Sequence, residues 1–375
     1  MFSLSYIALK VKSSKYLLST FTFSILCYLI YLFLYQNTYI DTWTYGIAGS
    51  DMLSYYKAAE SWFLFNIPPN LSFSNLSFSG VFSNDFGYYI YIFLLKYLLF
   101  YPNLGYFNVL LLKVLNFLII YIAVLKIYFS TNKNIYIYTL LITNLSFYFV
   151  SARILRDSLI FYLMANTYSY ALSNSRRSNL YYSINTFFLF LFRNYTLLIT
   201  IPLFLYKKKK TNLWYAFYII FFLVVAIISI FNVTIFQNIL NLETDQLLFS
   251  SLQFLLSPDI IDSFIKLIDS FNISTFTYFG LSCWLTYVFI FTFASLLKRP
   301  KSDFYFLNLF SLLSIALLYG LMYEGANEPR HKLMMLIPLV FLANEGRILL
   351  KNREKFFNIL LITFIVILLF ILSIL

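Results

Sequence analysis

Long apolar runs broken by short charged segments constrain the fold of this chain more than any other feature. Residues 16–36, for example, contain no Asp, Glu, Lys or Arg, and runs of this kind recur to the end of the sequence. Hydrophobic residues make up 61% of the 375 positions and charged residues only 11%. A helix that crosses a bilayer needs about 20 apolar residues. The sequence therefore predicts a polytopic membrane protein.

The runs predict an all-α fold, because they are much longer than the strands of a membrane barrel and do not alternate between apolar and polar residues. We expect an integral membrane helical bundle of about 11 transmembrane helices, forming a single transmembrane domain over residues 1–375. The expected spans are 16–36, 106–129, 134–152, 154–173, 179–192, 194–206, 213–232, 276–297, 304–323, 333–346 and 356–375.

Two stretches do not fit a simple count of crossings. The spans 179–192 and 194–206 are short, and the sequence leaves open whether they cross fully or form a tight hairpin around Arg193. The apolar segment 86–101 is expected to lie as a helix in the membrane interface, because counting it as a crossing would misplace the later lysines. The first run follows Lys10, Lys12 and Lys15 and is too long for a signal-peptide core, so we expect an uncleaved first span.

The basic residues set the orientation of the bundle. With this count of spans, one side of the membrane receives 18 of the 27 Lys and Arg residues and only three acids. Cytoplasmic segments are enriched in Lys and Arg, so this side and the N-terminus are expected to be cytoplasmic. The net charge of +12 then reports membrane orientation, and nucleic acid is excluded as a partner. Two long loops, 37–105 and 233–275, fall on the outer side.

Ionisable groups gather on that outer side, where they are candidates for a functional site. The first long loop contains Asp51, Tyr55 and Asp85. The turn "SARILRDSLIF" brings Arg153, Arg156 and Asp157, and Arg193 lies in another outer turn. The stretch "GANEPRHKLMMLIPL" brings the third group: Glu324, Glu328, Arg330, His331 and Lys332.

Each group also has a purely structural interpretation. Arg153 and Asp157 would share one face of a helix and form an ion pair that caps a span. Arg330 and Lys332 would only extend to lipid headgroups, and Asp51 would only cap a helix in the loop. Convergence of three separate segments on one side favours function, since the chain has no soluble domain that would hold a catalytic site elsewhere.

Arginines at a membrane surface suit a phosphate, because the guanidinium stays charged and makes two-pronged hydrogen bonds to phosphoryl oxygens. Pro329 is expected to start the helix that enters the bilayer, with Arg330 and His331 in the anion-attracting first turn. Asp51 or His331 would accept a proton from an attacking hydroxyl. No metal-ligand motif is present, so no cofactor is expected; the sequence leaves open a Mg²⁺ ion held by Asp51 and a substrate phosphate. Cys27 and Cys283 lie in apolar spans and are expected to be buried thiols.

The order of these motifs resembles the GT-C superfamily of membrane glycosyltransferases. "GSDMLSYYKAA" is similar to the early acidic motif of that family, with Asp51 at the acidic position. "RILRDSL" is similar to its second charged motif, and "RHKLMMLIP" to its late outer element. The larger members of the family end in a soluble outer domain, which is not expected in this sequence.

The chain also resembles the O-antigen and capsule repeat-unit polymerases, which have ten to fourteen spans and no soluble domain. This resemblance implies a bacterial inner-membrane enzyme that polymerises undecaprenyl-diphosphate-linked glycan, working beside a chain-length regulator or other polysaccharide-assembly proteins. Arg153, Arg156, Arg330 and Lys332 would hold the donor phosphates, with Asp157, Tyr55, Asp85, Arg193, Glu324 and Glu328 in support. A single-sugar transferase using a polyprenyl phosphate, and a flippase for lipid-linked sugars, stay open as alternatives.

Overall fold

The computed structural model of the chain shows helices as the only regular elements in the part it describes. The described residues are 15–39, 91, 94, 95, 98, 106–153, 156–173, 177–193, 196–231, 247–258, 260–297, 302–323 and 329–349. The chain divides into two compact units, residues 1–196 and 197–375, and each is described by itself. The expectation of one transmembrane domain over the whole chain stays a prediction.

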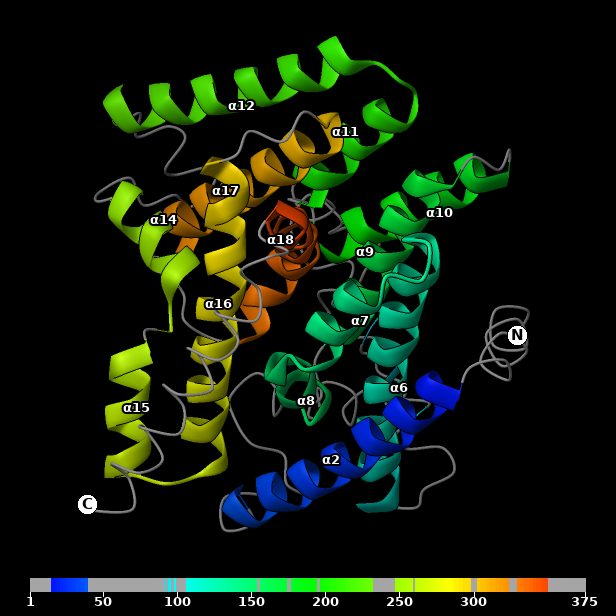
Figure 1. Ribbon diagram of the computed structural model, residues 1–375, viewed down its shortest axis with the longest axis vertical. Coiled ribbons are helices and arrows are strands. Elements are labelled where there is room, and N and C mark those ends of the chain that lie inside the picture. Colours follow the sequence, from blue (N-terminus) through cyan, green and yellow to red (C-terminus); the bar gives the residue numbers. More distant parts are fainter. Residues whose placement is uncertain are drawn as a thin grey trace, which may run out of the picture. The chain divides into compact units, whose positions relative to one another are not determined.

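The first unit contains six helices within its described residues (Figure 1). They are α2 (Lys15–Tyr39), α6 (Tyr106–Ser130), α7 (Ile135–Ile142), α8 (Leu145–Ser151), α9 (Asp157–Leu172) and α10 (Arg177–Phe192). Helix α9 packs most extensively on α6 and α10. Hydroxyl groups connect α2, α6 and α7: the Tyr138 hydroxyl lies 2.8 Å from Oγ1 of Thr20 and 2.9 Å from the hydroxyl of Tyr121.

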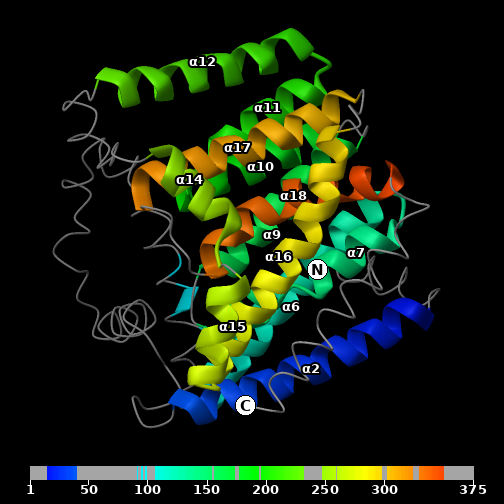
Figure 2. The ribbon, with the colours of Figure 1, turned by 60° about the vertical axis from the view of Figure 1, so that its left-hand side comes forward.

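The second unit contains seven helices within its described residues. They are α11 (Leu197–Lys207), α12 (Thr211–Phe231), α14 (Leu247–Leu256), α15 (Ile260–Asp269), α16 (Ile273–Leu297), α17 (Asp303–Tyr323) and α18 (Pro329–Leu349). Helix α18 runs along α16 and α17, and α15 lies against α16 (Figures 1 and 2). Nearly every residue of α18 from His331 to Asn344 is buried, which makes it the core helix of this unit.

A glycine allows the closest approach of α16 and α18. A Cβ atom added at Gly346 would overlap the backbone carbonyl of Phe291. Small residues let membrane helices pack with their backbones in contact, which strengthens dispersion between them. The position therefore requires glycine for packing, although glycine lowers the intrinsic stability of a helix.

Three helices of the described part are long and apolar enough to cross a membrane: Leu17–Tyr35, Val109–Ser130 and Ile273–Leu296. Shorter apolar helices cover 197–207, 211–225 and 303–319. Large apolar side chains stay exposed on these elements, among them Phe23 and Ile30 of α2 and Ile219 and Ile220 of α12. In a bilayer, lipid would cover these faces, so the apolar side chains would not be exposed to water. The prediction of a helical membrane bundle is confirmed at this level, and the number of eleven spans stays a prediction.

The expected span 134–152 is broken in the structure. Helix α7 ends at Ile142, and α8 begins at Leu145. Asn144 between them has extended backbone angles, and its side-chain oxygen accepts a hydrogen bond of 2.8 Å from the backbone N–H of Ser146. Asparagine stabilises a new helix start in this way, so the apolar run forms two short helices in place of one.

Other boundaries agree with the sequence. Helices α10 and α11 are short and separated at Arg193, as expected for 179–192 and 194–206. Helix α18 begins at Pro329. In the segment 86–101, residues 91, 94, 95 and 98 are helical; Tyr91 and Leu95 are buried, while Leu94 and Leu98 are exposed. The loops 37–105 and 233–275 lie partly outside the described residues.

Candidate functional site

The first unit gathers basic side chains at helix ends that are far apart in the sequence. We call Tyr35, Lys113, Asn116, Arg153, Arg156, Asp157 and Arg193 the basic cluster. Tyr35 lies near the end of α2, Lys113 and Asn116 near the start of α6, Arg153 and Arg156 between α8 and α9, and Arg193 just after α10. In a chain that alternates across a bilayer, these ends fall on the same side.

Arg153 has neutral neighbours in the part of the chain that the structure describes. Its Nε donates a hydrogen bond of 3.2 Å to the hydroxyl of Tyr35. The centre of its guanidinium lies 3.9 Å from the ring centroid of Phe149, a cation–π distance. Arg153 lies in the turn after α8, not on the helix that begins at Asp157. The expected pairing of Arg153 with Asp157 on one helical face is therefore replaced by contacts with α2 and α8.

Lys113 and Asn116 extend the cluster from α6. Nζ of Lys113 lies 5.7 Å from the ring centroid of Tyr35, and Nδ2 of Asn116 donates a hydrogen bond of 3.1 Å to the backbone carbonyl of Arg153. Both side chains are buried. Tyr35 thus lies between a lysine and an arginine, and Asn116 fixes the backbone of the turn that carries the arginine.

Asp157 forms its ion pair with Arg193. Nη2 of Arg193 lies 3.3 Å from Oδ1 of Asp157, and each side chain is only 9% exposed. Arg156 is also buried and occupies the residue before the first turn of α9. The carboxylate at the start of α9 is favoured by the positive end of the helix dipole as well as by Arg193.

The arrangement concentrates positive charge. Lys113, Arg153, Arg156 and Arg193 contribute four cations, against one carboxylate from Asp157 among the described residues of the cluster. An anion with several oxygens, such as a phosphate or diphosphate, suits guanidinium groups best, because each guanidinium can donate two parallel hydrogen bonds to it.

The second unit holds the remaining described candidates, Arg330, His331 and Lys332, in the first turn of α18. Lys332 is fully buried; its Nζ donates to the backbone carbonyl of Phe254 and lies 4.0 Å from the ring centroid of the same residue. Lys332 thus fastens α18 to α14 and does not extend outward to lipid headgroups. A role for Lys332 in phosphate binding stays a prediction.

His331 lies tilted beside an aromatic stack. Its ring centroid lies 5.5 Å from that of Tyr319 on α17, and Tyr319 stacks on Phe254 at 4.5 Å with the ring planes 7° apart. His331 is 9% exposed, and Arg330 beside it is more accessible. The stack orients the imidazole from one side, which is what a positioned base requires.

Five predicted site residues lie outside the described residues: Asp51, Tyr55, Asp85, Glu324 and Glu328. Their roles stay predictions. Among the described residues, no group of three His, Cys, Asp or Glu side chains lies close enough to hold a metal ion. Cys27 and Cys283 are both free and partly exposed. The expectation that both thiols are buried is therefore wrong.

Sequence reasoning missed Tyr35, Lys113 and Asn116 as members of the site. A signal for two of them was present, because Lys113 and Asn116 are polar residues three positions apart inside an otherwise apolar span. That spacing places them on one face of a helix, and polar residues at membrane depth are usually functional or paired. Tyr35 gave no comparable signal, since tyrosine is common at membrane interfaces.

Comparison with known proteins finds no matching family model, no matching characterised protein and no matching solved structure.

Proposed function

We propose that this chain is a membrane glycosyltransferase of bacterial surface-polysaccharide synthesis. Its donor is an undecaprenyl-(di)phosphate-linked glycan, and its reaction joins repeat units into a polymer. The enzyme works in the bacterial inner membrane with its N-terminus in the cytoplasm and its site on the outer side. The apolar helices support a membrane location, and the distribution of Lys and Arg supports this orientation.

The observation that carries the proposal is the environment of the Arg153 guanidinium. Its guanidinium has only neutral partners within the described residues, Tyr35 and Phe149, and Nζ of Lys113 lies 5.7 Å from the ring centroid of the same Tyr35. An arginine held by a hydroxyl and an aromatic face keeps its charge and several donors available for a ligand. A lipid-linked diphosphate brings the matching oxygens to the membrane surface, where this cluster is expected.

The reaction assigns a role to each group. The acceptor hydroxyl attacks the anomeric carbon of the donor glycan, and a new carbon–oxygen bond forms there. The bond from that carbon to the phosphate oxygen breaks, and undecaprenyl diphosphate leaves with the electron pair. Arg153, Arg156 and Arg330 stabilise the negative charge that develops on the leaving group. Asp51 or His331 takes the proton of the acceptor hydroxyl. No metal is required by these steps.

The test is a polymerisation assay with purified protein in lipid nanodiscs and an undecaprenyl-diphosphate-linked repeat unit. Products longer than one repeat unit support the proposal. Arg153→Lys should reduce the rate at least about tenfold, because lysine keeps the charge but loses the two-pronged donor. Arg347→Lys, at the other end of α18, is the matched control and should keep the wild-type rate. Absence of elongated product from the wild type would overturn the proposal.

A second candidate is a flippase or transporter for lipid-linked sugars, and the break between α7 and α8 favours it. Transporters place interrupted helices near the middle of the membrane, and Thr143 and Asn144 fall at the middle of the expected span 134–152. Proteoliposomes distinguish the two candidates. Transfer of the lipid-linked sugar across the bilayer without elongation would support transport. A product one sugar longer, made from a polyprenyl phosphate, would identify a single-sugar transferase.

A further inference from the structure

The second unit contains a pocket that the proposed phosphate chemistry does not use. The pocket has a volume of about 370 Å³ and lies between the end of α14, helix α15 and the start of α16. Small-molecule sites in proteins have volumes of roughly 300–1,000 Å³, so this one suits a small ligand. Ten residues line it, among them Gln253, Asp262, Lys266, Ser274 and Tyr278.

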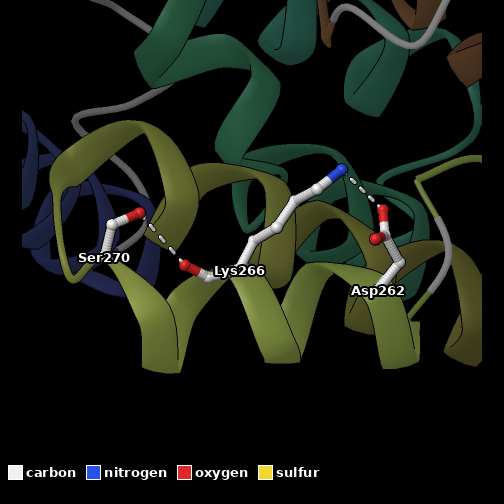
Figure 3. A network of polar contacts seen from close by, with 3 residues as sticks. All are labelled: Asp262, Lys266 and Ser270. Carbon is white, nitrogen blue, oxygen red and sulfur yellow. Dashed lines mark hydrogen bonds and ion pairs between the residues drawn. The ribbon is translucent and has the colours of Figure 1, made fainter.

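The lining mixes polar and apolar side chains and carries no net charge. Eight of its ten residues have side chains that donate or accept hydrogen bonds, and the two charged ones, Asp262 and Lys266, form an ion pair of 2.7 Å with each other. Figure 3 shows the ammonium group of Lys266 turned back along α15 to the Asp262 carboxylate. A phosphate would meet the carboxylate as well as the ammonium. A neutral ligand with many hydroxyl groups would find partners throughout the lining.

Tyr278 gives the pocket a partly exposed aromatic side chain beside these polar groups. An aromatic ring packs against an apolar face while its hydroxyl end makes hydrogen bonds. A pyranose sugar presents that combination, with C–H groups on its faces and hydroxyl groups around its edge. The pocket therefore combines the two contacts that a sugar needs, an aromatic surface and a surrounding set of donors and acceptors.

Helix α15, which lines one side of the pocket, places it close to the membrane. Ile261, Ile265 and Ile268 lie on one exposed face of α15, with 67%, 51% and 37% of their surface accessible. Asp262 and Lys266 lie on a different face, which lines the pocket. Only Ser270, Phe271 and Asn272 separate α15 from the membrane-spanning helix α16. Helix α15 packs along α16 (Figures 1 and 2), so its exposed isoleucine face is available to the lipid beside that helix.

We propose that this pocket binds a neutral sugar unit of the glycan at the membrane surface. The proposal rests on the proposed glycosyltransferase function for the identity of the glycan, because the pocket itself specifies only a neutral polyhydroxyl ligand. Gln253, Asp262, Lys266 and Ser274 supply hydrogen bonds to the hydroxyl groups, and Tyr278 packs against one face of the sugar ring. The apolar face of α15 keeps the pocket where a lipid-linked glycan or a growing polymer would pass.

Binding is measured without turnover, by saturation-transfer difference NMR on the full chain in nanodiscs. The probes are neutral methyl glycosides of glucose, galactose, mannose, rhamnose, N-acetylglucosamine and N-acetylgalactosamine. At least one of them should receive saturation from the protein. If none of the six binds, the proposal is overturned.

Variants assign the binding to this pocket. Tyr278→Ala and Gln253→Ala should each lower the affinity for the glycoside about fivefold to tenfold, because each removes one ring contact or one hydrogen-bonding group. Ser270→Ala is the matched control, because Ser270 bonds to the backbone carbonyl of Lys266 at the end of α15 but does not line the pocket (Figure 3). Binding that is unchanged in both Tyr278→Ala and Gln253→Ala would place the sugar elsewhere and reject the assignment.

A second arm separates the source of the sugar. We compare the binding of two ligands to wild type and to Tyr278→Ala: the lipid-linked repeat unit, and the same oligosaccharide released from its lipid. If the variant binds both ligands more weakly, the pocket recognises the sugar. If it binds both as well as wild type does, the proposal is overturned. Weakening of the lipid-linked form alone identifies the donor as the ligand. The outcome is independent of the polymerisation assay, so wild-type protein that binds sugar but makes no polymer would count against the proposed function and not against the pocket.

Discussion

Arg193 and Asp157 form a buried ion pair of 3.3 Å that joins the turn after α10 to the start of α9. The two residues are 36 positions apart. The pair fixes the end of α10 beside the turn that carries Arg153 and Arg156. Because the side chains are almost completely covered, the attraction between them is weakly screened.

We expect Asp157→Asn to destabilise the protein strongly. The substitution breaks the buried ion pair with Arg193, and breaking such a pair costs about 3–5 kcal/mol in folded proteins. Unfolding of the purified protein in a mild detergent, followed by circular dichroism against denaturant, measures the change. Asp262→Asn is the matched control: it breaks the exposed pair with Lys266, whose groups are about two-thirds accessible, and should change stability little. Equal effects of the two substitutions would show that the Asp157 pair adds nothing through burial.

Gly346 provides a test of the packing in the second unit. Gly346→Leu should separate α16 from α18, because even a Cβ atom would overlap the carbonyl of Phe291. Overpacking of this kind costs about 1–3 kcal/mol or more and should lower the unfolding temperature of the purified protein. Gly280→Ala, at a partly exposed position of α16, is the control and should be neutral or stabilising. A Gly346→Leu protein as stable as wild type would contradict the contact.

Orientation is tested with single cysteines. In a variant in which Cys27 and Cys283 are replaced by serine, Ser72→Cys and Ser250→Cys should react with an impermeant thiol reagent in intact spheroplasts. Both positions belong to the loops that the distribution of Lys and Arg assigns to the outside. Ser302→Cys, next to Lys298, Arg299 and Lys301, should react only after the membrane is opened. Protection of both loop positions would reverse the orientation and move the site to the cytoplasm.

The two remaining donor-site arginines provide a further prediction. Arg156→Lys and Arg330→Lys should each insert and express normally but lose most polymer synthesis, because lysine cannot bond a diphosphate with two parallel donors. The chain lengths of polysaccharide extracted from cells measure the loss, with Arg347→Lys as control. Normal chain lengths from both lysine variants would leave the structural interpretation, in which these side chains only stabilise the protein or contact headgroups.

The sequence predicts the kind of fold well, because apolar length alone decides whether a segment suits a bilayer. It also predicts the start of α18, since proline fits the first turn of a helix and disrupts its interior. It does not predict the break at Asn144. Hydropathy averaged over 134–152 conceals one buried asparagine, whose hydrogen bond to the Ser146 backbone outweighs the continuity of the apolar run.

The site is less predictable than the fold, because its contacts join distant segments. The spacing of Arg153 and Asp157 implies a local pair only if both lie on one helix, and α9 begins too late for that. The partner of Asp157 therefore comes from beyond α10, and the partner of Arg153 from α2. Such long-range pairs depend on how helices pack, which a single sequence does not specify.

His331 carries the last prediction. The imidazole is mostly buried, lies beside the ring of Tyr319 and belongs to the first turn of α18. A neutral imidazole is suited to accept the proton of the acceptor hydroxyl. His331→Gln keeps hydrogen bonding but cannot act as a base near neutral pH, so purified variant protein should be folded and should polymerise lipid-linked repeat units at least about tenfold more slowly. Tyr319→Phe keeps the ring beside His331 and should retain the wild-type rate. Equal turnover by His331→Gln would remove the histidine from the mechanism and leave Asp51 as the base.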